Sequence, residues 1–453
     1  MTTAAQIGLV VAIGGVLAAP LAARVLRRRF DPFEPIVLFA LAYGVMFVVR
    51  PAAMLADDHL AYDGPRASTD VSGTFTKMLL LALVGAAAFV VAYETSTGRR
   101  LASSWRGLGE LATPRVVAAA LLIGGVGVAS FVAFLASSDG LSSLSLIFRG
   151  RTEELSKDVA GTTFYLWYGF FLLVPATLVL FAIGLERRRK LLLLAGLAFG
   201  ALFLLRTVPL GARIAILPLL GGAFVFYYLR RSRRPSVVVL AALVLVTLVG
   251  SAFLSDLRGR GTRGESVGQT VVRSTHPHRI VAPLVSGPDT EMAPVLAAAL
   301  SQIPSKLHYT YGRTILGDLV SRPIPRALWS DKPEPPRDKL IRSLWPVERR
   351  KGGINPEFSV LLYFFWDFGI PGVVVGMLVC GVGARALFEY FRNYRHSTAV
   401  QLLYSLALWF VVIGLRNSPI DTFVQLVFVV FPAWLAVRLS ERRGVRFAAA
   451  VSR

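Results

Sequence analysis

Residues 236–254 read SVVVLAALVLVTLVGSAFL, an apolar run without a charged residue that follows Arg233 and Arg234. A helix of about 20 such residues spans the roughly 30 Å hydrocarbon core of a bilayer. Further segments fit this template, although 191–229 can also be read as one broken hairpin. The candidate spans lie near 5–23, 35–49, 78–94, 115–137, 162–185, 191–209, 214–229, 236–254, 370–391, 398–415 and 422–440. This pattern predicts an all-α polytopic membrane protein with about 11 transmembrane helices.

The composition of the 453 residues excludes other classes of protein. Hydrophobic residues make up 55% and charged residues only 17%, with a mean hydropathy of +0.60. Such a chain cannot cover a soluble surface, and it has too much to bury to remain disordered. The net charge of +22 would indicate nucleic-acid binding in a soluble protein, but nucleic acid is not expected here. The single cysteine, Cys380, excludes an intramolecular disulfide and a cysteine-based metal cluster.

The basic residues of the short loops predict the orientation. Alternate loops carry most of these Lys and Arg residues, for example 187–190 and 230–234. Because short cytoplasmic loops are enriched in Lys and Arg, the N-terminus is expected outside and the C-terminus in the cytoplasm. The first span is not expected to be a cleaved signal peptide, because its basic residues follow the apolar run instead of preceding it.

One long segment, 255–357, falls outside this charge rule because long loops cross the membrane regardless of their charge. It contains the apolar stretches Ala293–Leu300 and Ile315–Val320. Long connections are usually functional or disordered, and these stretches favour a folded structure. We therefore expect transmembrane helices 1–8 in 1–254, an extracytoplasmic cap with short helices in 255–357, and helices 9–11 with a cytoplasmic tail in 358–453.

Arginines recur on the predicted outer face. The planar guanidinium fork matches phosphate oxygens, so several arginines at a membrane surface suit a diphosphate head group. Anchoring to lipid phosphates, or snorkelling to the interface, is the alternative reading for each one. The candidates outside the cap motifs are Arg151, Arg206, Arg213, Arg258 and Arg416.

Two cap motifs combine aromatic and charged residues. They are Tyr309-Thr-Tyr311-Gly-Arg313 and the segment 323–333, which contains Arg326, Trp329 and Lys332. Aromatic faces stack on sugar rings while charged groups bind hydroxyls or phosphate, so these motifs favour a sugar site. A proline-rich loop with Trp and Tyr in the interfacial aromatic belt is the alternative.

The outer segment also carries candidates for a general base. Among its carboxylates, Glu357 lies where the cap returns to the bilayer, and desolvation there would raise its pKa. An ordinary carboxylate at a helix start is the alternative reading of Glu357. Asp367 is expected to face protein or water instead of lipid. The other carboxylate candidates are Glu153, Glu154, Asp318 and Asp331.

Cofactor signatures are missing from the sequence. His276-Pro-His278 has no acidic partner at metal-ligand spacing, so no metal site is expected. There is no Walker loop, dinucleotide fingerprint, HExxH or Gly-x-Ser-x-Gly motif. An enzyme of this kind would draw its driving force from the substrate, and a lipid-diphosphate sugar meets that requirement.

The order and spacing of several motifs resemble the O-antigen and exopolysaccharide repeat-unit polymerases of the Wzy type, most clearly over about 200–440. These motifs are Gly211-Ala-Arg213, Pro323-Ile-Pro-Arg326 with Trp329-Ser-Asp-Lys332-Pro333, Gly353-Ile-Asn-Pro-Glu357 followed by 361–372, and Arg416-Asn417. Asp367 stands where that family commonly has Asn. The N-terminal half resembles the family only in hydropathy.

The resemblance implies a GT-C-like, metal-independent inverting glycosyltransferase without a cofactor. It would polymerise undecaprenyl-diphosphate-linked oligosaccharides on the outer face of the bacterial cytoplasmic (inner) membrane, with a chain-length regulator as a candidate partner. Arg213, Arg326 and Arg416, helped by Lys332, would hold the donor diphosphate. Glu357 or a cap histidine would act as base. The remaining expected substrate-binding residues are Arg151, Arg206, Arg258, Arg313 and the aromatic residues Tyr309, Tyr311 and Trp329.

Two rival functions stay open on the sequence. An O-antigen ligase-type glycan transferase would use the same lipid-linked donor. A lipid-linked oligosaccharide flippase or other transporter commonly shows inverted repeats, and none is evident in this sequence. A receptor or structural anchor gives no reason for arginines at the outer span ends.

Overall fold

The structure is a computed structural model. It describes residues 2–63, 68–109, 111, 114–137, 163–208, 212–258, 267–276, 285, 287, 290–322, 324, 328–329, 331–346 and 356–440. Of the predicted site residues, Arg151 and Arg326 lie outside the described residues, as do Glu153, Glu154 and His278. For Arg258 only the backbone is described.

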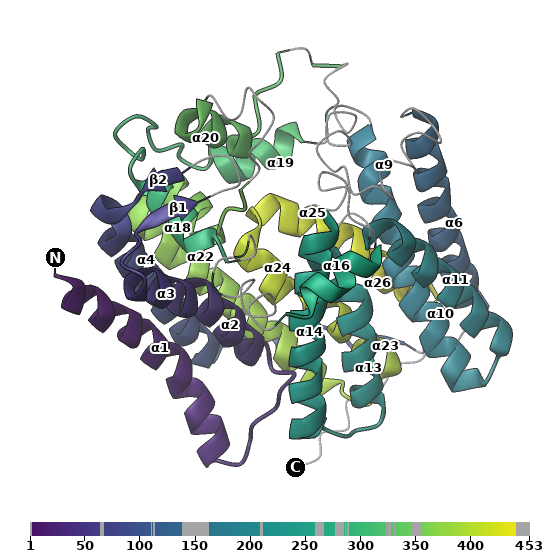
Figure 1. The fold of residues 1–453 in the computed structure, drawn as a ribbon. Helices are drawn as coiled ribbons and strands as arrows, with labels where there is room; N and C mark the ends of the chain where they lie inside the picture. Colours follow the sequence, from purple (N-terminus) through teal and green to yellow (C-terminus); the bar gives the residue numbers. More distant parts are fainter. Residues whose placement is uncertain are drawn as a thin grey trace.

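The chain is a bundle of long apolar helices (Figure 1). Within the described ranges, 11 helices are long and apolar enough to cross a membrane, as the sequence predicts. They are Thr3–Leu26, Pro35–Ala56, Ser72–Glu94, Pro114–Ala136, Leu166–Arg187, Lys190–Thr207, Arg213–Arg230, Val237–Leu254, Val360–Asn393, Thr398–Arg416 and Pro419–Ser440. The all-α, polytopic class is therefore confirmed, and the stretch 191–229 forms two separate helices.

The first eight spans are built from the following elements. They are α1 (Thr3–Leu26), α2 (Pro35–Gly44), η1 (Val45–Val49), α3 (Arg50–Ala56), α4 (Ser72–Glu94), α6 (Pro114–Ser137), α9 (Thr163–Gly169), η2 (Phe170–Leu172), α10 (Leu173–Arg187), α11 (Lys190–Thr207), α12 (Arg213–Ile216), η3 (Leu217–Gly221), α13 (Gly222–Arg230) and α14 (Val237–Arg258). The short helix α5 (Thr97–Ser103) follows α4. One antiparallel hairpin, β1 (Ala61–Asp63) with β2 (Ser68–Asp70), departs from the all-α expectation.

The described residues between α14 and the ninth span contain short helices. They are α16 (Val267–Ser274), α18 (Met292–Leu300), η4 (Arg313–Gly317), α19 (Asp318–Ser321) and α20 (Pro336–Leu344). The last spans comprise α22 (Val360–Asn393), α23 (Thr398–Ala407), α24 (Phe410–Arg416), α25 (Pro419–Val429) and α26 (Phe431–Ser440). Figure 1 shows α19, α20 and the hairpin at one end of the bundle, which we call the cap end. The opposite end, where α1, α4 and α13 finish, is called the loop end.

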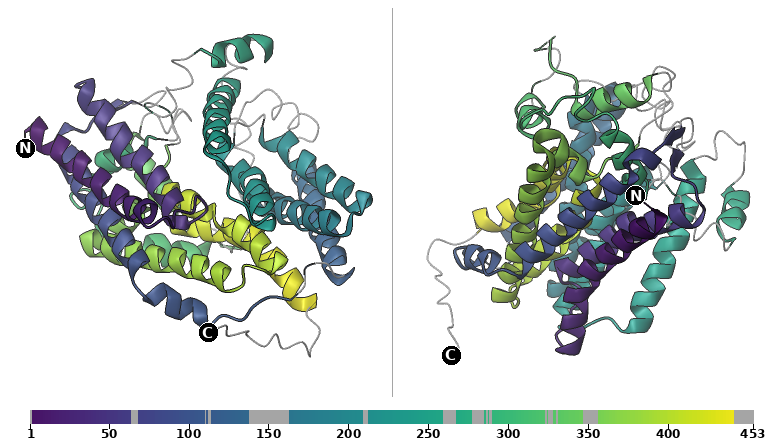
Figure 2. Two further views of the ribbon diagram at one scale, coloured as in Figure 1. Left: turned by 90° about the horizontal axis from the view of Figure 1, so that it is seen from below. Right: turned by 90° about the vertical axis from the view of Figure 1, so that its left-hand side faces the viewer.

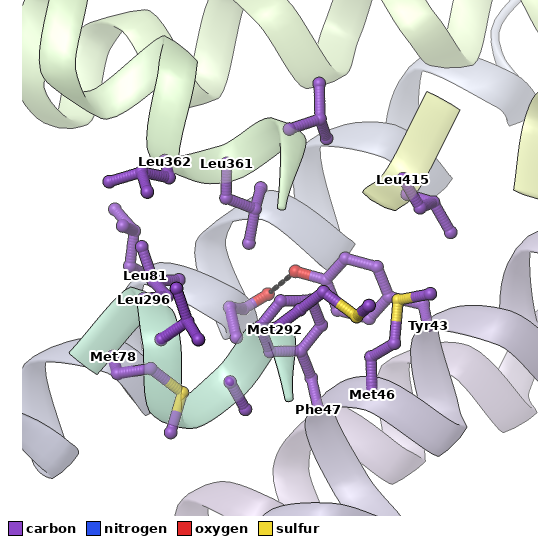
Figure 3. Close-up of a cluster of buried hydrophobic side chains, with 14 of the residues drawn as sticks. Tyr43, Met46, Phe47, Met78, Leu81, Met292, Leu296, Leu361, Leu362 and Leu415 are labelled. Carbon is purple, nitrogen blue, oxygen red and sulfur yellow. Dashed lines mark hydrogen bonds between the residues drawn. The ribbon is translucent and has the colours of Figure 1, made fainter. Parts of the chain in front are cut away.

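The apolar helix α18 is a core element and not only part of a covering segment. All nine of its residues are buried. Figure 3 shows Met292 and Leu296 of α18 among Met78 and Leu81 of α4 and the side chain of Leu361 of α22. Full burial of each such side chain stabilises the fold by about 1.5–3 kcal/mol. Helix α18 thus belongs to the first of two hydrophobic clusters, and the second forms around α6, α10, α13 and α23.

The outer helices have the exposure expected of lipid-facing spans. Of the 18-residue apolar stretch in each helix, only 22% of the residues are buried within the chain in α1 and 6% in α14. The right-hand view of Figure 2 shows α1 along the outside of the bundle. Large apolar side chains of α14, such as Val238 and Leu245, also remain exposed. A bilayer supplies the apolar environment that these side chains lack within the chain.

The ninth span begins earlier than predicted. The sequence places its start at 370, after Asp367, whereas α22 begins at Val360. Inside α22 the backbone leaves the helical region at Phe368 and Gly369, where Gly369 has φ 64° and ψ −148°. The first part of α22 packs against the protein core. The break at Phe368 and Gly369 follows it, and the helix then continues through Pro371.

Candidate functional site

The α24–α25 turn places Arg416 at the cap end. Ser418 accepts a hydrogen bond from the backbone N–H of Asp421 at 2.9 Å and donates to Asp421 Oδ2 at 2.7 Å. Pro419 occupies the first turn of α25, where its missing N–H needs no partner. This serine cap fixes a tight turn, so that Arg416 ends one helix and Asp421 lies in the first turn of the next.

Glu357 lies between two guanidinium groups. Its Oε1 is 3.5 Å from Arg416 Nη2, and its Oε2 is 3.8 Å from Arg337 Nη2. The Arg416 side chain is only 12% exposed and that of Glu357 is 28% exposed, so the charges interact in partly desolvated surroundings. The structure therefore brings together two of the predicted catalytic residues, Glu357 and Arg416.

Arg337 of α20 is a member of this cluster that the sequence reasoning missed. Its Nη2 donates to the carbonyl oxygen of Pro356 at 2.8 Å, and its guanidinium lies over the Phe358 ring at 5.9 Å. Burial opposes its charge, but Coulomb attraction, chiefly from Glu357, leaves the pKa of Arg337 raised. Pro335 and Pro336 begin α20 and could have marked this helix start in the sequence.

A second carboxylate, Glu291, completes the cluster. Its Oε1 accepts a hydrogen bond from the backbone N–H of Glu357 at 2.9 Å. Burial raises the pKa of Glu291 to about 7, although the Glu357 N–H, Arg416 and Arg337 oppose this shift. Such a carboxyl group can hold or release a proton near neutral pH, which is what a general acid or base requires. We refer to Glu291, Arg337, Glu357 and Arg416 as the carboxylate–arginine cluster.

The hairpin holds this cluster against the core. Tyr62 of β1 packs on Trp345 with ring centroids 4.9 Å apart, and the Trp345 indole N–H donates to Thr69 of β2 at 2.9 Å. Burial, and then the charge of Glu291, raises the pKa of Tyr62. The phenol of Tyr62 therefore stays neutral and next to the Glu291 carboxyl group.

A second charged network joins the cap segment to α25. Arg322 Nη2 lies 2.5 Å from Asp318 Oδ2, and Arg322 Nη1 also binds Asp421. Lys332 Nζ donates to the carbonyl oxygens of Ile324 at 2.9 Å and of Arg322 at 3.3 Å. Burial raises the pKa of Asp318 despite the opposing charge of Arg322. Lys332, expected at the diphosphate, thus binds the backbone at Arg322 and Ile324, and Asp318 is occupied by Arg322.

Asp367 organises the first cap motif. The side chain is fully buried and accepts hydrogen bonds from the backbone N–H of Thr314 at 3.1 Å and from the Thr310 hydroxyl. The backbone N–H of Tyr311 donates to the Asp367 carbonyl at 3.0 Å. The expectation that Asp367 faces protein is confirmed.

The predicted aromatic residues differ in their surroundings. Tyr309 is half-buried and meets Phe365 edge-on with ring centroids 5.9 Å apart. Tyr311 is 76% exposed, Trp329 is 36% exposed, and Arg313 is exposed at the start of η4. Tyr311 and Trp329 are therefore accessible to solvent, whereas Tyr309 lies against α22.

The two predicted arginines of the middle spans lie elsewhere. Arg213 Nη1 donates to Ser251 Oγ at 2.6 Å and to the Ser251 carbonyl at 3.3 Å, which holds it against α14. Arg206 is 3% exposed, and its guanidinium carbon lies 3.5 Å from the Trp167 ring centroid and 4.3 Å from that of Phe170. The ion pairs of Glu357 are formed by Arg337 and Arg416, and the structure does not bring Arg206 or Arg213 into them.

Metal ligation has no candidate in the described part of the chain, where no three His, Cys, Asp or Glu side chains are grouped to hold an ion. Comparisons with protein-family models, with curated proteins and with solved structures found no match.

Proposed function

We propose that this chain is an integral-membrane glycosyltransferase that polymerises undecaprenyl-diphosphate-linked oligosaccharide repeat units. The observation that carries this proposal is the Glu357 carboxylate between Arg337 and Arg416, with Glu291 bound to the backbone of the same residue. Arginine forks suit a diphosphate, and a carboxylate can accept the proton of a sugar hydroxyl. A GT-C-like mechanism in the cytoplasmic membrane, with the cap end outside, accompanies this proposal.

An anionic substrate would exchange partners with Glu357. Both guanidinium groups face this carboxylate, at 3.5 and 3.8 Å. A donor diphosphate brings more charge than one carboxylate and can accept from both arginine forks. The exchange would release Glu357 from its ion pairs at the moment when the donor is bound, so that binding of the donor activates the base.

The transfer step then follows from these roles. The acceptor hydroxyl oxygen attacks the anomeric carbon of the donor sugar, and a new C–O bond forms as the bond to the diphosphate oxygen breaks. The hydroxyl proton passes to Glu357, and the negative charge remains on the departing lipid diphosphate. Arg337 and Arg416 would stabilise that charge, an effect worth several kcal/mol in a partly desolvated site. Glu291 would position Glu357 through its backbone N–H.

The test uses purified protein and a synthetic undecaprenyl-diphosphate-linked repeat unit, without nucleotide or added metal. We expect a polymer ladder from the wild type. Loss of a general base costs about 10²–10⁴-fold in rate, so Glu357→Gln should abolish the ladder. Arg416→Lys keeps the charge but loses the fork, and should retain only part of the activity. Arg188→Gln, an exposed arginine at the loop end, is the matched control.

The same assay separates the rival functions. Polymer made from single repeats excludes a pure flippase or transporter. Transfer of preformed glycan to a lipid A core acceptor, without a ladder, would instead indicate the ligase. A full ladder from Glu357→Gln and Arg416→Ala at wild-type rate would overturn the proposed roles of these residues.

A further inference from the structure

A large cavity lies at the loop end of the bundle, opposite the carboxylate–arginine cluster. Its volume is about 1470 Å³, and α1, α4, α5, α13 and α22 border it. The left view of Figure 2 looks onto this end of the molecule. Arginine is the most frequent residue in its lining. The arginines are Arg24, Arg27, Arg28, Arg29, Arg99, Arg233, Arg234, Arg385, Arg392 and Arg395.

Two of these arginines have a structural role. Arg24 Nε and Nη2 each donate to the Glu34 carboxylate at 2.8 Å, and Arg385 Nη1 lies 3.8 Å from Glu34 Oε1. The Tyr93 hydroxyl donates to the same carboxylate at 3.0 Å. Arg24 also pairs with Glu94 at 2.8 Å. These bonds fix the floor of the cavity and use two of its three acidic residues, the third being Asp31.

Several other arginines stand exposed at the rim of the cavity. Arg27, Arg28 and Arg29 follow α1 and are exposed, as are Arg233 and Arg234 after α13. The orientation rule explains why basic residues stand at this end. It does not explain their convergence on one cavity, because the basic triplet Arg187, Arg188 and Arg189 at the same end lies outside it.

Below this basic rim the cavity has an apolar wall. Val16, Ala19 and Ala23 of α1 face it together with Ala87, Val90 and Val91 of α4. Val16 and Leu26 are about 15 Å apart along α1, close to the depth of one hydrocarbon leaflet. The small side chains leave room for an acyl chain, which a free anion would not need.

We propose that this cavity binds an anionic phospholipid of the bilayer, with its phosphate at the arginine rim and an acyl chain along the α1–α4 wall. Basic pockets between transmembrane helices on the cytoplasmic side are suited to such head groups. Guanidinium groups bind phosphate oxygens by paired hydrogen bonds, and the apolar wall removes part of the chain from solvent. This site is independent of the proposed transferase reaction.

The test measures lipid binding to the purified full-length chain in detergent, where orientation in the membrane plays no part. Native mass spectrometry compares phosphatidylglycerol with phosphatidylcholine of the same acyl chains. We expect tighter binding of the anionic lipid. The triple variant Arg27→Gln, Arg28→Gln and Arg29→Gln should bind it at least about tenfold more weakly. The matched variant Arg187→Gln, Arg188→Gln and Arg189→Gln removes the same charge outside the cavity and should stay close to wild type.

A second variant tests the acyl wall and leaves every arginine in place. Ala19 is exposed on α1, so Ala19→Trp should fold and fill the wall, and it should weaken phosphatidylglycerol binding by a similar factor. Equal losses in the two arginine triplets would overturn the proposal, because they would indicate general surface attraction. Displacement of the lipid by excess inorganic phosphate would show a free-phosphate site. Unchanged binding of phosphatidylglycerol by Ala19→Trp would show that the α1–α4 wall holds no acyl chain. Either result would overturn the lipid assignment.

Discussion

Arg206 and Arg416 are both nearly buried, but their surroundings compensate the charge in different ways. Arg416 faces the Glu357 carboxylate, which another anion can replace. Arg206 is held by the faces of Trp167 and Phe170, contacts that are worth up to about 2 kcal/mol each when desolvated. Among the described residues, Nε and Nη2 of Arg206 have no hydrogen-bond partner. Of the two arginines, Arg416 has the environment that suits exchange with a diphosphate.

The sequence predicted only part of this cluster. Glu357 and Arg416 were identifiable because each lies at the end of an apolar span. Glu291 meets the backbone of Glu357 across 66 residues of sequence, and no local pattern marks that contact. Arg337 sits on a short helix whose position depends on tertiary packing. The missing half of the cluster thus depends on long-range contacts, which hydropathy and spacing do not encode.

The raised pKa of Glu291 predicts a pH dependence of stability. In the folded chain the carboxyl group keeps its proton up to about pH 7, whereas its ordinary pKa is 4.5. Between these values the folded state binds more protons than the unfolded state, so the free energy of unfolding falls as pH rises. The loss is up to about 3 kcal/mol and is complete above pH 7. Thermal unfolding of the wild type and of Glu291→Gln, measured from about pH 5 to pH 8, tests this.

Glu291→Gln cannot ionise, so its Tm should vary less over this pH range and exceed that of the wild type at the alkaline end. Asp331→Asn removes an exposed carboxylate of the same segment and serves as the control. Parallel curves for the wild type and Glu291→Gln would contradict the assignment of this proton to Glu291.

At the scale of elements, the break in α22 connects the bundle to the first cap motif. The indole N–H of Trp366 donates to the His308 carbonyl at 3.2 Å, and the Thr310 N–H donates to the Trp366 carbonyl at 3.0 Å. The segment 308–314 therefore docks where α22 stops being regular. In the sequence, Asp367 and Pro371 indicated an interruption of the apolar run. Hydropathy could not show that the residues before this interruption are already helical. These apolar residues, from Val360 to Trp366, face protein and not lipid.

Gly369 makes this break possible, and its replacement should be costly. With φ 64° and ψ −148° it occupies a region that is essentially restricted to glycine. An added Cβ would also lie 3.4 Å from the Tyr309 hydroxyl. We expect Gly369→Ala to destabilise the chain by about 1–3 kcal/mol, seen as a lower Tm in detergent.

Gly383, on the same helix, provides the matched comparison. A Cβ there meets no atom within 4 Å, so Gly383→Ala should be neutral or stabilising by up to about 1 kcal/mol. Equal Tm values for Gly369→Ala and Gly383→Ala would argue against a backbone requirement at Gly369.

At the scale of the whole molecule, apolar run length was sufficient to predict the number and approximate positions of the spans. All eleven candidate spans overlap helices of the required length, because a bilayer imposes one length on every crossing segment. The same criterion could not show that α18 enters the core, since nine apolar residues are too few to span. Its place beside Tyr43 and Leu361 results from packing between distant segments (Figure 3).

The orientation predicted from the basic loops can be tested with the single native cysteine removed. In a Cys380→Ser background, Lys339→Cys places an exposed thiol on α20 at the cap end, and Ser104→Cys places one after α5 at the loop end. Because the loop end carries the basic clusters, we expect a membrane-impermeant maleimide to label Lys339→Cys in cells with an intact cytoplasmic membrane. Ser104→Cys should react only after permeabilisation. The reverse pattern would place the carboxylate–arginine cluster in the cytoplasm, where lipid-linked repeats awaiting polymerisation are not expected, and would overturn both the orientation and the proposed reaction.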